Sequence, residues 1–202
     1  MPEQRARPLA TGPCPLATVR HTDWLYHHLT VAGPEDRVAA FRRAATGAGV
    51  IPWTLDLDRM EEDFFHRLMV PPTGQLRTLS LDGARLLAAE LRDAVARRHA
   101  AAVARVGRST ACPFDLFSVV PVPADVLRLG PDHPDALSWL WTHWGTTQAL
   151  RHVVSRQPSG VSGQGWRVGF WAADWTPWRA LLRIRTDWPA LRIHIRPVYE
   201  LA

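Results

Sequence analysis

Polar side chains that could take part in chemistry gather in two short stretches of the sequence. The first, THWGTTQALR (142–151), places His143, Thr146, Thr147 and Arg151 around Gly145, which lets backbone approach a ligand closely. The second, AADWTPW (172–178), adds an aspartate just before the expected start of a helix. Together the two stretches predict a binding cleft, formed by His143, Trp144, Thr146, Thr147, Arg151, Asp174 and Trp175.

The tryptophans of the first stretch have a second interpretation. Trp141 and Trp144 can pack a helix against a sheet, while Gly145 ends that helix and Thr146 satisfies carbonyls left free at its end. Aromatic residues at helical spacing usually mark burial in a core. We therefore favour the structural role for Trp141 and Trp144, and the cleft remains the alternative.

Asp174 also has two interpretations. Close to His143 or Arg151 it would form an acid–base pair, as a hydrolase or transferase would need. Next to a helix N-terminus it would simply interact with the helix dipole or pair with an arginine. The second interpretation requires fewer assumptions, so we expect a protein that binds rather than one that catalyses.

Several common catalytic and cofactor motifs are absent from the sequence. There is no G-x-S-x-G, no phosphate-binding G-x-x-x-x-G-K and no G-x-G-x-x-G. The nine histidines show no close metal-ligand spacing, and Cys14 and Cys112 belong to no C-x-x-C pair. We therefore expect no metal and no cofactor, and a non-enzymatic binding protein.

Arginine supplies all 24 basic residues of the 202-residue chain, and the formal net charge is +5. A GC-rich genome favours arginine codons, and recognition of phosphate or carboxylate favours the guanidinium fork. The arginines are spread along the chain, which favours the genomic explanation. The expected partner is a peptide, a small anionic ligand or nucleic acid. No apolar run is long enough to span a membrane, so we expect a cytoplasmic protein without a membrane partner.

Hydrophobic periodicity predicts most elements. Residues 23–31 alternate as a half-buried strand in which His27 falls on the apolar face, and Gly33 is the expected N-cap of the next helix. The long helix at 80–106 is expected to bury a stripe of Leu87, Leu91 and Val95. The other elements are helices at 34–45, 59–69, 134–144 and 176–188, and strands at 146–156, 166–175 and 190–200. The buried face of the helix at 134–144 is expected to comprise Leu137, Leu140, Trp141 and Trp144.

The order of these elements predicts an α+β fold. Residues 23–46 and 146–199 form a ferredoxin-like split βαβ core, a four-stranded antiparallel sheet covered by two helices. Residues 47–145 form a large, mainly helical insertion, and 23–202 are a single domain. Residues 1–22, broken by four prolines, are a flexible N-terminal arm.

The outer face of such a sheet offers one more candidate site. RRM domains, which are also ferredoxin-like, bind single-stranded RNA there by stacking bases on aromatic side chains. The insertion is expected to pack on the sheet and to cover part of this face. The residues expected on the face are Trp166, Phe170, Arg192, His194 and Arg196.

Three stretches resemble uncharacterised plasmid- and phage-borne proteins with a ferredoxin-like domain: DWLYHHLTVAGPEDRVAAF, HWGTTQA and GFWAADWTPWRALLRI. In that family they correspond to a first strand leading into a Gly-Pro helix turn, an Asn-Trp-Gly-Thr motif and an Ala-Trp-Ser-Pro-Pro strand exit. The chain departs from the pattern where His143 replaces asparagine, Thr147 replaces a lysine-like residue and Thr176 replaces serine. The resemblance covers about residues 23–46 and 139–199, and it implies a fold and a mobile-element origin but no activity.

Overall fold

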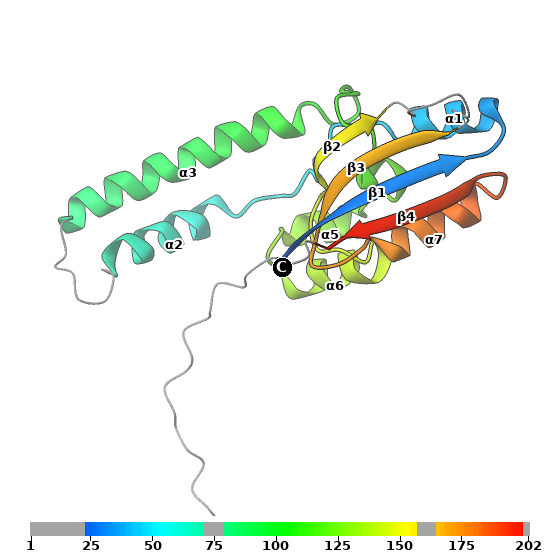
Figure 1. The fold of residues 1–202 in the computed structure, drawn as a ribbon. Coiled ribbons are helices and arrows are strands. Elements are labelled where there is room, and N and C mark those ends of the chain that lie inside the picture. Colours follow the sequence, from blue (N-terminus) through cyan, green and yellow to red (C-terminus); the bar gives the residue numbers. More distant parts are fainter. Residues whose placement is uncertain (1–22, 71–78, 157–164, 200–202) are drawn as a thin grey trace, which may run out of the picture.

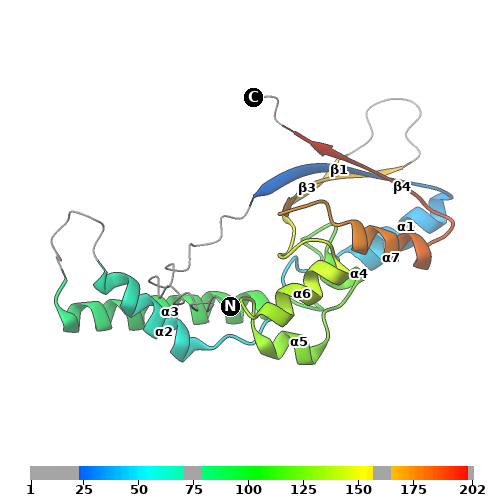
Figure 2. The same ribbon diagram turned by 90° about the horizontal axis from the view of Figure 1, so that it is seen from below.

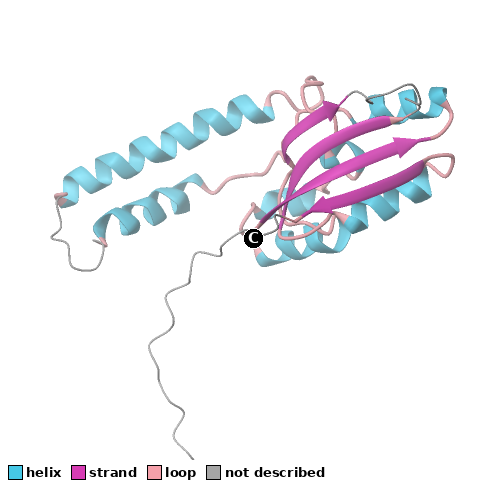
Figure 3. Cartoon of the chain, in the orientation of Figure 1, coloured by secondary structure: helices cyan, strands magenta, loops and turns pink. Residues whose placement is uncertain are grey.

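A four-stranded antiparallel sheet forms the centre of the computed structural model, which describes residues 23–70, 79–156 and 165–199. The predicted arm at 1–22 lies outside the described residues. The strands lie in the order β2-β3-β1-β4 (Figures 1 and 3). Their bounds are Trp24–Ala32 (β1), Arg151–Arg156 (β2), Trp166–Ala173 (β3) and Arg192–Val198 (β4). The predicted α+β class and four-stranded antiparallel sheet are confirmed.

Strand β1 lies between β3 and β4 and alternates as predicted. His27, Leu29 and Val31 are buried, while Tyr26, His28 and Thr30 lie on the opposite face. Side chains two residues apart in a strand point to the same side, so a hydrophobic set at these positions fixes which face meets the core.

Helices cover one face of the sheet and leave the other face open (Figure 2). The apolar side chains of this layer, Phe41, Leu116, Leu140 and Ile184 among them, pack with those of the sheet in one core. The helices of this layer are α1 (Glu35–Ala45), α4 (Leu116–Val119), α5 (Ala124–Leu129), α6 (Pro134–His143) and α7 (Trp178–Asp187).

The remaining two helices, α2 (Leu57–Met69) and α3 (Leu81–Val103), pack against each other and project away from the sheet (Figure 1). The expectation that the insertion covers the outer face is therefore wrong for this hairpin. The buried residues of α3 are Ala84 and Ala88, and the expected stripe of leucines is wrong, since Leu87 and Leu91 are exposed. Small side chains allow two helices to approach closely, and a pattern of large apolar residues does not reveal such a contact.

A short neck joins the projecting hairpin to the sheet layer. The backbones of Gly47 and Cys112 exchange two hydrogen bonds, each of 2.9 Å. Beside them the buried carboxylate of Asp115 accepts hydrogen bonds from the backbone amides of Gly49 (2.8 Å) and Phe117 (3.0 Å). A Cβ atom on Gly47 would lie 2.2 Å from the Asp115 carboxylate, so glycine leaves the space that this carboxylate fills. These contacts bring the two ends of the hairpin segment together.

Two expected N-caps are wrong by one residue, and one strand is shorter than expected. Helix α1 is capped by Pro34 rather than Gly33, and α7 by Pro177 rather than Thr176. The Thr176 hydroxyl is instead hydrogen bonded to the ring of His27, at 2.8 Å from its Nε2 atom. Residues 146–150, expected to begin the second strand, form bends and irregular structure before β2.

Helix α6 buries fewer of the expected side chains than its apolar spacing suggested. Leu140 and Trp144 are fully buried together with Ala136, whereas Trp141 is 50% exposed and its expected burial is wrong. Spacings of four residues, 136, 140 and 144, therefore define the buried stripe. Ala136 completes that stripe with a small side chain, which a pattern of large apolar residues does not reveal.

The buried His27 is expected to make stability depend on pH. Its ring stacks on Phe170, with ring centroids 5.3 Å apart, and burial lowers the pKa of His27 from 6.5 to about 4. As pH falls, the unfolded chain takes up this proton near pH 6.5 and the folded chain only near pH 4, so stability is lost in that window. We expect His27 to lower the free energy of unfolding by about 2 kcal/mol between about pH 7.5 and about pH 5, measured by urea denaturation.

The matched variants for this prediction are His27→Gln and His28→Gln, which remove neighbouring imidazoles on opposite faces of β1. His27→Gln should remove most of the pH dependence, and His28→Gln should leave most of it. Equal pH dependence in the wild-type protein and His27→Gln would contradict the prediction. If His27→Gln does not fold, an NMR titration of the His27 ring in the wild-type protein measures the same pKa.

Candidate functional site

Two residues of the predicted cleft belong to the interior. Trp144 is 0% exposed, and its indole Nε1 donates a hydrogen bond to the carbonyl of Val120 at 2.8 Å. The hydroxyl of Thr146 donates to the carbonyl of Ala173 at 2.7 Å. Trp144 therefore ties α6 to the segment before α5, and Thr146 ties the following turn to the end of β3.

Four further residues of the predicted cleft lie around that end of β3 or on the neighbouring strands. The hydroxyl of Thr147 donates a hydrogen bond to the carboxylate of Asp174, whose backbone has a positive φ of 62°. The guanidinium of Arg151 stacks on the ring of Trp24, 3.9 Å from its centroid. Trp175 is 53% exposed. The structure thus brings Thr147 and Asp174 together, while Arg151 lies on the sheet.

His143 contacts its own helix. Its Nδ1 atom lies 2.9 Å from the carbonyl of Trp139, and its ring stacks on the Trp139 indole with centroids 4.2 Å apart. Across the described ranges no hydrogen bond or ion pair joins His143 to Asp174, whose carboxylate accepts from Thr147 instead. A hydrolase or transferase built on this pair stays a prediction.

The open face of the sheet carries a larger group of polar and aromatic side chains, arranged in three rows that cross all four strands. Strand register defines each row, because paired residues point to the same face. The cationic row contains Arg156, Arg167, Thr30 and His194. The middle row contains Val154, Gly169, His28 and Arg196. The aromatic row contains Arg151, Trp171, Tyr26 and Val198.

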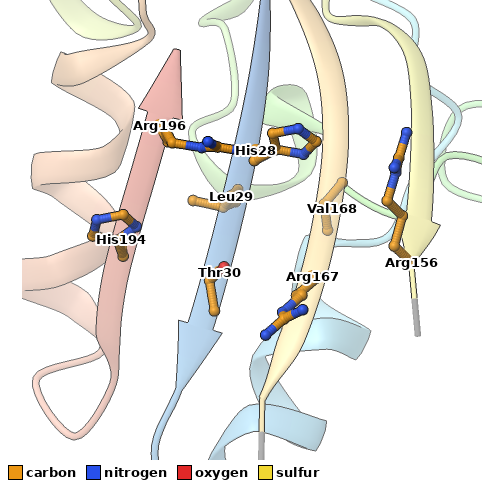
Figure 4. Close-up of a pocket in the computed structure, with 8 residues that line it drawn as sticks. All are labelled: His28, Leu29, Thr30, Arg156, Arg167, Val168, His194 and Arg196. Carbon is orange, nitrogen blue, oxygen red and sulfur yellow. The ribbon is translucent and has the colours of Figure 1, made fainter. Parts of the chain in front are cut away.

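A depression of about 390 Å³ lies across the cationic and middle rows (Figure 4). Arg196 reaches from β4 towards His28 on β1, while Arg156 and Arg167 approach from β2 and β3 (Figure 4). Leu29 and Val168 also border the depression, but their side chains are buried on the core side of the sheet, so only their backbones face it. The residues that line the depression are His28, Leu29, Thr30, Arg156, Arg167, Val168, His194 and Arg196.

Positive charge in this depression is not balanced by nearby acids. None of the residues in the four strands is an aspartate or a glutamate. No ion pair joins Arg156, Arg167 or Arg196 to a carboxylate within the part of the chain that the structure describes. Desolvation lowers the pKa of His28, and the charges of Arg196 and Arg156 lower it further. An anion bound here would replace repulsion by charge-assisted hydrogen bonds.

The aromatic row lies next to the depression and is joined to it. Tyr26 and Trp171 are half-buried, with ring centroids 5.2 Å apart. The phenol of Tyr26 lies across Gly169, where a Cβ atom would approach its hydroxyl oxygen to 2.1 Å, and this oxygen accepts a hydrogen bond from Arg156 (3.1 Å). Glycine at 169 thus lets an aromatic ring lie flat on the sheet beside the cationic depression.

The expectation for this face was correct for its cations and wrong for its aromatic residues. Arg192, His194 and Arg196 are exposed on the open face. Trp166 and Phe170 are buried on the opposite face, against Phe41 and Phe114.

Sequence reasoning missed several residues of this face: His28, Tyr26, Arg156, Arg167 and Trp171. Alternation within β3 could have identified two of them. Arg167 and Trp171 are four residues apart and share one face of the strand, while Trp166 and Phe170 share the other.

The alignment of Arg151 and Arg156 depends on an irregularity in β2. Residues five apart in a regular strand point to opposite faces. The register shifts between Arg151 and Val154, and His152 in this stretch has a positive φ of 48°. Such a bulge adds one residue to one strand and re-aims the side chains beyond it. It places both arginines on the open face.

Other groups offer less chemistry. Burial raises the pKa of the Cys112 thiol to about 11, so the thiol stays protonated at neutral pH and is a poor nucleophile. Within residues 23–70, 79–156 and 165–199, no three histidine, cysteine, aspartate or glutamate side chains gather in a way that could hold a metal ion. Among the same residues no helix is both long and apolar enough to cross a membrane.

No family model matches the chain, and no curated protein matches it in sequence. Among solved structures the chain is similar to the crystal structure of protein api92 from Yersinia pseudotuberculosis, whose family model is DUF1281. The two share 10% sequence identity with a TM-score of 0.49, over 89% of this chain and 91% of that chain. The geometry of the open face is therefore the basis for a functional proposal.

Proposed function

We propose that this protein is a non-enzymatic binding protein and that the open face of its sheet binds single-stranded nucleic acid. The observation that carries the proposal is a combination on the sheet face that no described helix covers. Arginines without a carboxylate partner among the described residues lie there beside the rings of Tyr26 and Trp171. Arginine guanidiniums bind phosphates, and aromatic rings stack on unpaired bases of any sequence. A small anion without an aromatic group would use the cations and leave the aromatic row without a role.

The arrangement of the sheet supports this proposal. From β4 the strand order is β4-β1-β3-β2, with α1 following β1 and α7 following β3, which is why we assign the sheet to the ferredoxin-like split βαβ class. In that arrangement the face opposite the helices is the one available to nucleic acid. A cytoplasmic location and an origin on a plasmid or phage remain predictions from the sequence.

Fluorescence anisotropy with a labelled single-stranded DNA of about 12 nucleotides tests the proposal. We expect phosphate contacts from Arg156, Arg167 and Arg196. A plot of the logarithm of the binding constant against the logarithm of the salt concentration should then have a slope of about −2. The double variant Arg167→Gln/Arg196→Gln should bind at least about tenfold more weakly at low salt, with a slope smaller by about 1.4. Arg43→Gln, an exposed arginine of α1, is the matched control and should bind like the wild-type protein.

A second arm of the experiment separates stacking from charge. Trp171→Leu should weaken binding of the single strand by about 1 kcal/mol, because a base loses its stacking partner. Binding of a duplex of the same sequence should not change, since its bases are already stacked. If the double arginine variant retains wild-type affinity for the single strand, or if no binding occurs at low salt, the proposed function is wrong.

A further inference from the structure

The depression on the open face concentrates more positive charge than one backbone phosphate needs. Arg156, Arg167 and Arg196 approach it from three different strands, with the imidazoles of His28 and His194 beside them. A phosphodiester within a strand carries one negative charge. A phosphomonoester carries about 1.5 to 2 negative charges at neutral pH and offers three strong acceptor oxygens. The local charge therefore matches a terminal phosphate better than an internal one.

The shape of the depression also suits a compact group. Its volume of about 390 Å³ lies in the range of small-molecule sites, which is about 300–1,000 Å³. The side chain of Arg196 extends from β4 towards His28 on β1, so that this guanidinium lies over the sheet (Figure 4). Of the arginines on the open face, Arg156, Arg167 and Arg196 line this one depression, while Arg151 and Arg192 lie outside it.

The aromatic row lies at the right distance to hold the base of the same nucleotide. Tyr26 is two residues before His28 on β1, a separation of about 7 Å along the strand. The Tyr26 hydroxyl accepts a hydrogen bond from Arg156, so ring and depression meet at a shared contact of 3.1 Å. A base against Tyr26 and Trp171 would direct its own phosphate towards the arginines.

We infer that the open face holds the phosphorylated end of a nucleotide, with its phosphomonoester in the depression and its base against Tyr26 and Trp171. This inference rests on the proposed function, because that function brings nucleic-acid chemistry to this face. The same chemistry has two sources, a free nucleoside monophosphate or the phosphorylated end of a single strand. Both present one base and one phosphomonoester.

Anisotropy measurements on the wild-type chain compare three labelled strands of one sequence, carrying a 5′-phosphate, a 3′-phosphate or hydroxyls at both ends. One phosphorylated strand should bind about tenfold more tightly than the unphosphorylated strand, since charge-assisted hydrogen bonds to guanidinium groups are strong. Adenosine monophosphate, adenosine and inorganic phosphate are then added as competitors. Adenosine monophosphate should compete more strongly than either of its parts.

Variants identify the side chains responsible for the preference for phosphorylated strands. Arg167→Gln/Arg196→Gln should abolish the difference between phosphorylated and unphosphorylated strands. Arg192→Gln removes one positive charge from the same face, outside the depression, and should preserve the difference. Trp171→Leu should weaken all strands and retain the ratio between them. All these side chains are exposed or half-buried, so the variants are expected to fold.

The outcomes distinguish the inference from the proposed function. Equal binding of phosphorylated and unphosphorylated strands would overturn the inference and leave single-strand binding in place. Binding of adenosine monophosphate without any strand would support the inference and overturn the proposed function. A phosphate preference that survives in Arg167→Gln/Arg196→Gln would overturn the inference, and binding of none of these molecules would overturn both.

Discussion

Trp144→Ala is expected to lower the free energy of unfolding by about 4 kcal/mol, and Trp141→Ala by about 1 kcal/mol or less. The two tryptophans lie three residues apart at the end of α6, but Trp144 is 0% exposed and Trp141 is 50% exposed. Removal of the Trp144 indole leaves a cavity under the sheet and leaves the carbonyl of Val120 without its hydrogen bond donor. Urea denaturation followed by far-ultraviolet circular dichroism measures both changes.

Trp144→Phe is the intermediate case, because it keeps an aromatic ring and loses the Nε1–H donor. It should cost about 2 kcal/mol and remains measurable if Trp144→Ala does not fold. If Trp144→Ala lowers the free energy of unfolding as little as Trp141→Ala does, the indole of Trp144 is not a core residue. Such a result would return Trp144 to the predicted cleft.

Asp115→Ala is expected to cost about 3 kcal/mol of unfolding free energy. The buried carboxylate accepts hydrogen bonds from the amides of Gly49 and Phe117, and alanine would leave both donors without a partner. Burial raises the pKa of Asp115, while hydrogen bonds from Gly49, Phe117, Ser118 and Ala48 act in the opposite direction. The carboxylate thus holds the neck of the hairpin through bonds that alanine cannot make.

Asp125→Ala is the control, since it removes the same charge from an exposed position in the first turn of α5. Its effect should stay within about 0.5 kcal/mol. Chemical denaturation of both variants at neutral pH compares the two. Losses of the same size would show that Asp115 stabilises the protein through its charge alone.

Local patterns were enough to predict the sheet and most helices. Alternation in β1 identified His27 as a buried residue, and the proline at 134 marked the start of α6. Such signals depend on residues close together in the sequence, where strand and helix periods differ clearly. Small residues were the main source of error. In α3 the buried side chains are those of Ala84 and Ala88, whereas the prediction relied on large apolar residues.

The open face could be predicted only in part. Arg192, His194 and Arg196 share one parity within β4, so their common face follows from the sequence. Their meeting with Arg156 and Arg167 depends on strand register and on the bulge at His152, which no local pattern specifies. The position of Tyr26 depends on Gly169, which is adjacent to it only in the folded sheet.

The paired backbones of Gly47 and Cys112 make the segment between them an appendage with closely spaced ends. An inserted segment with closely spaced ends can change in length or composition without disturbing the register of the strands in the sheet. The hairpin formed by α2 and α3 can therefore change in sequence without altering the sheet or the residues on its open face.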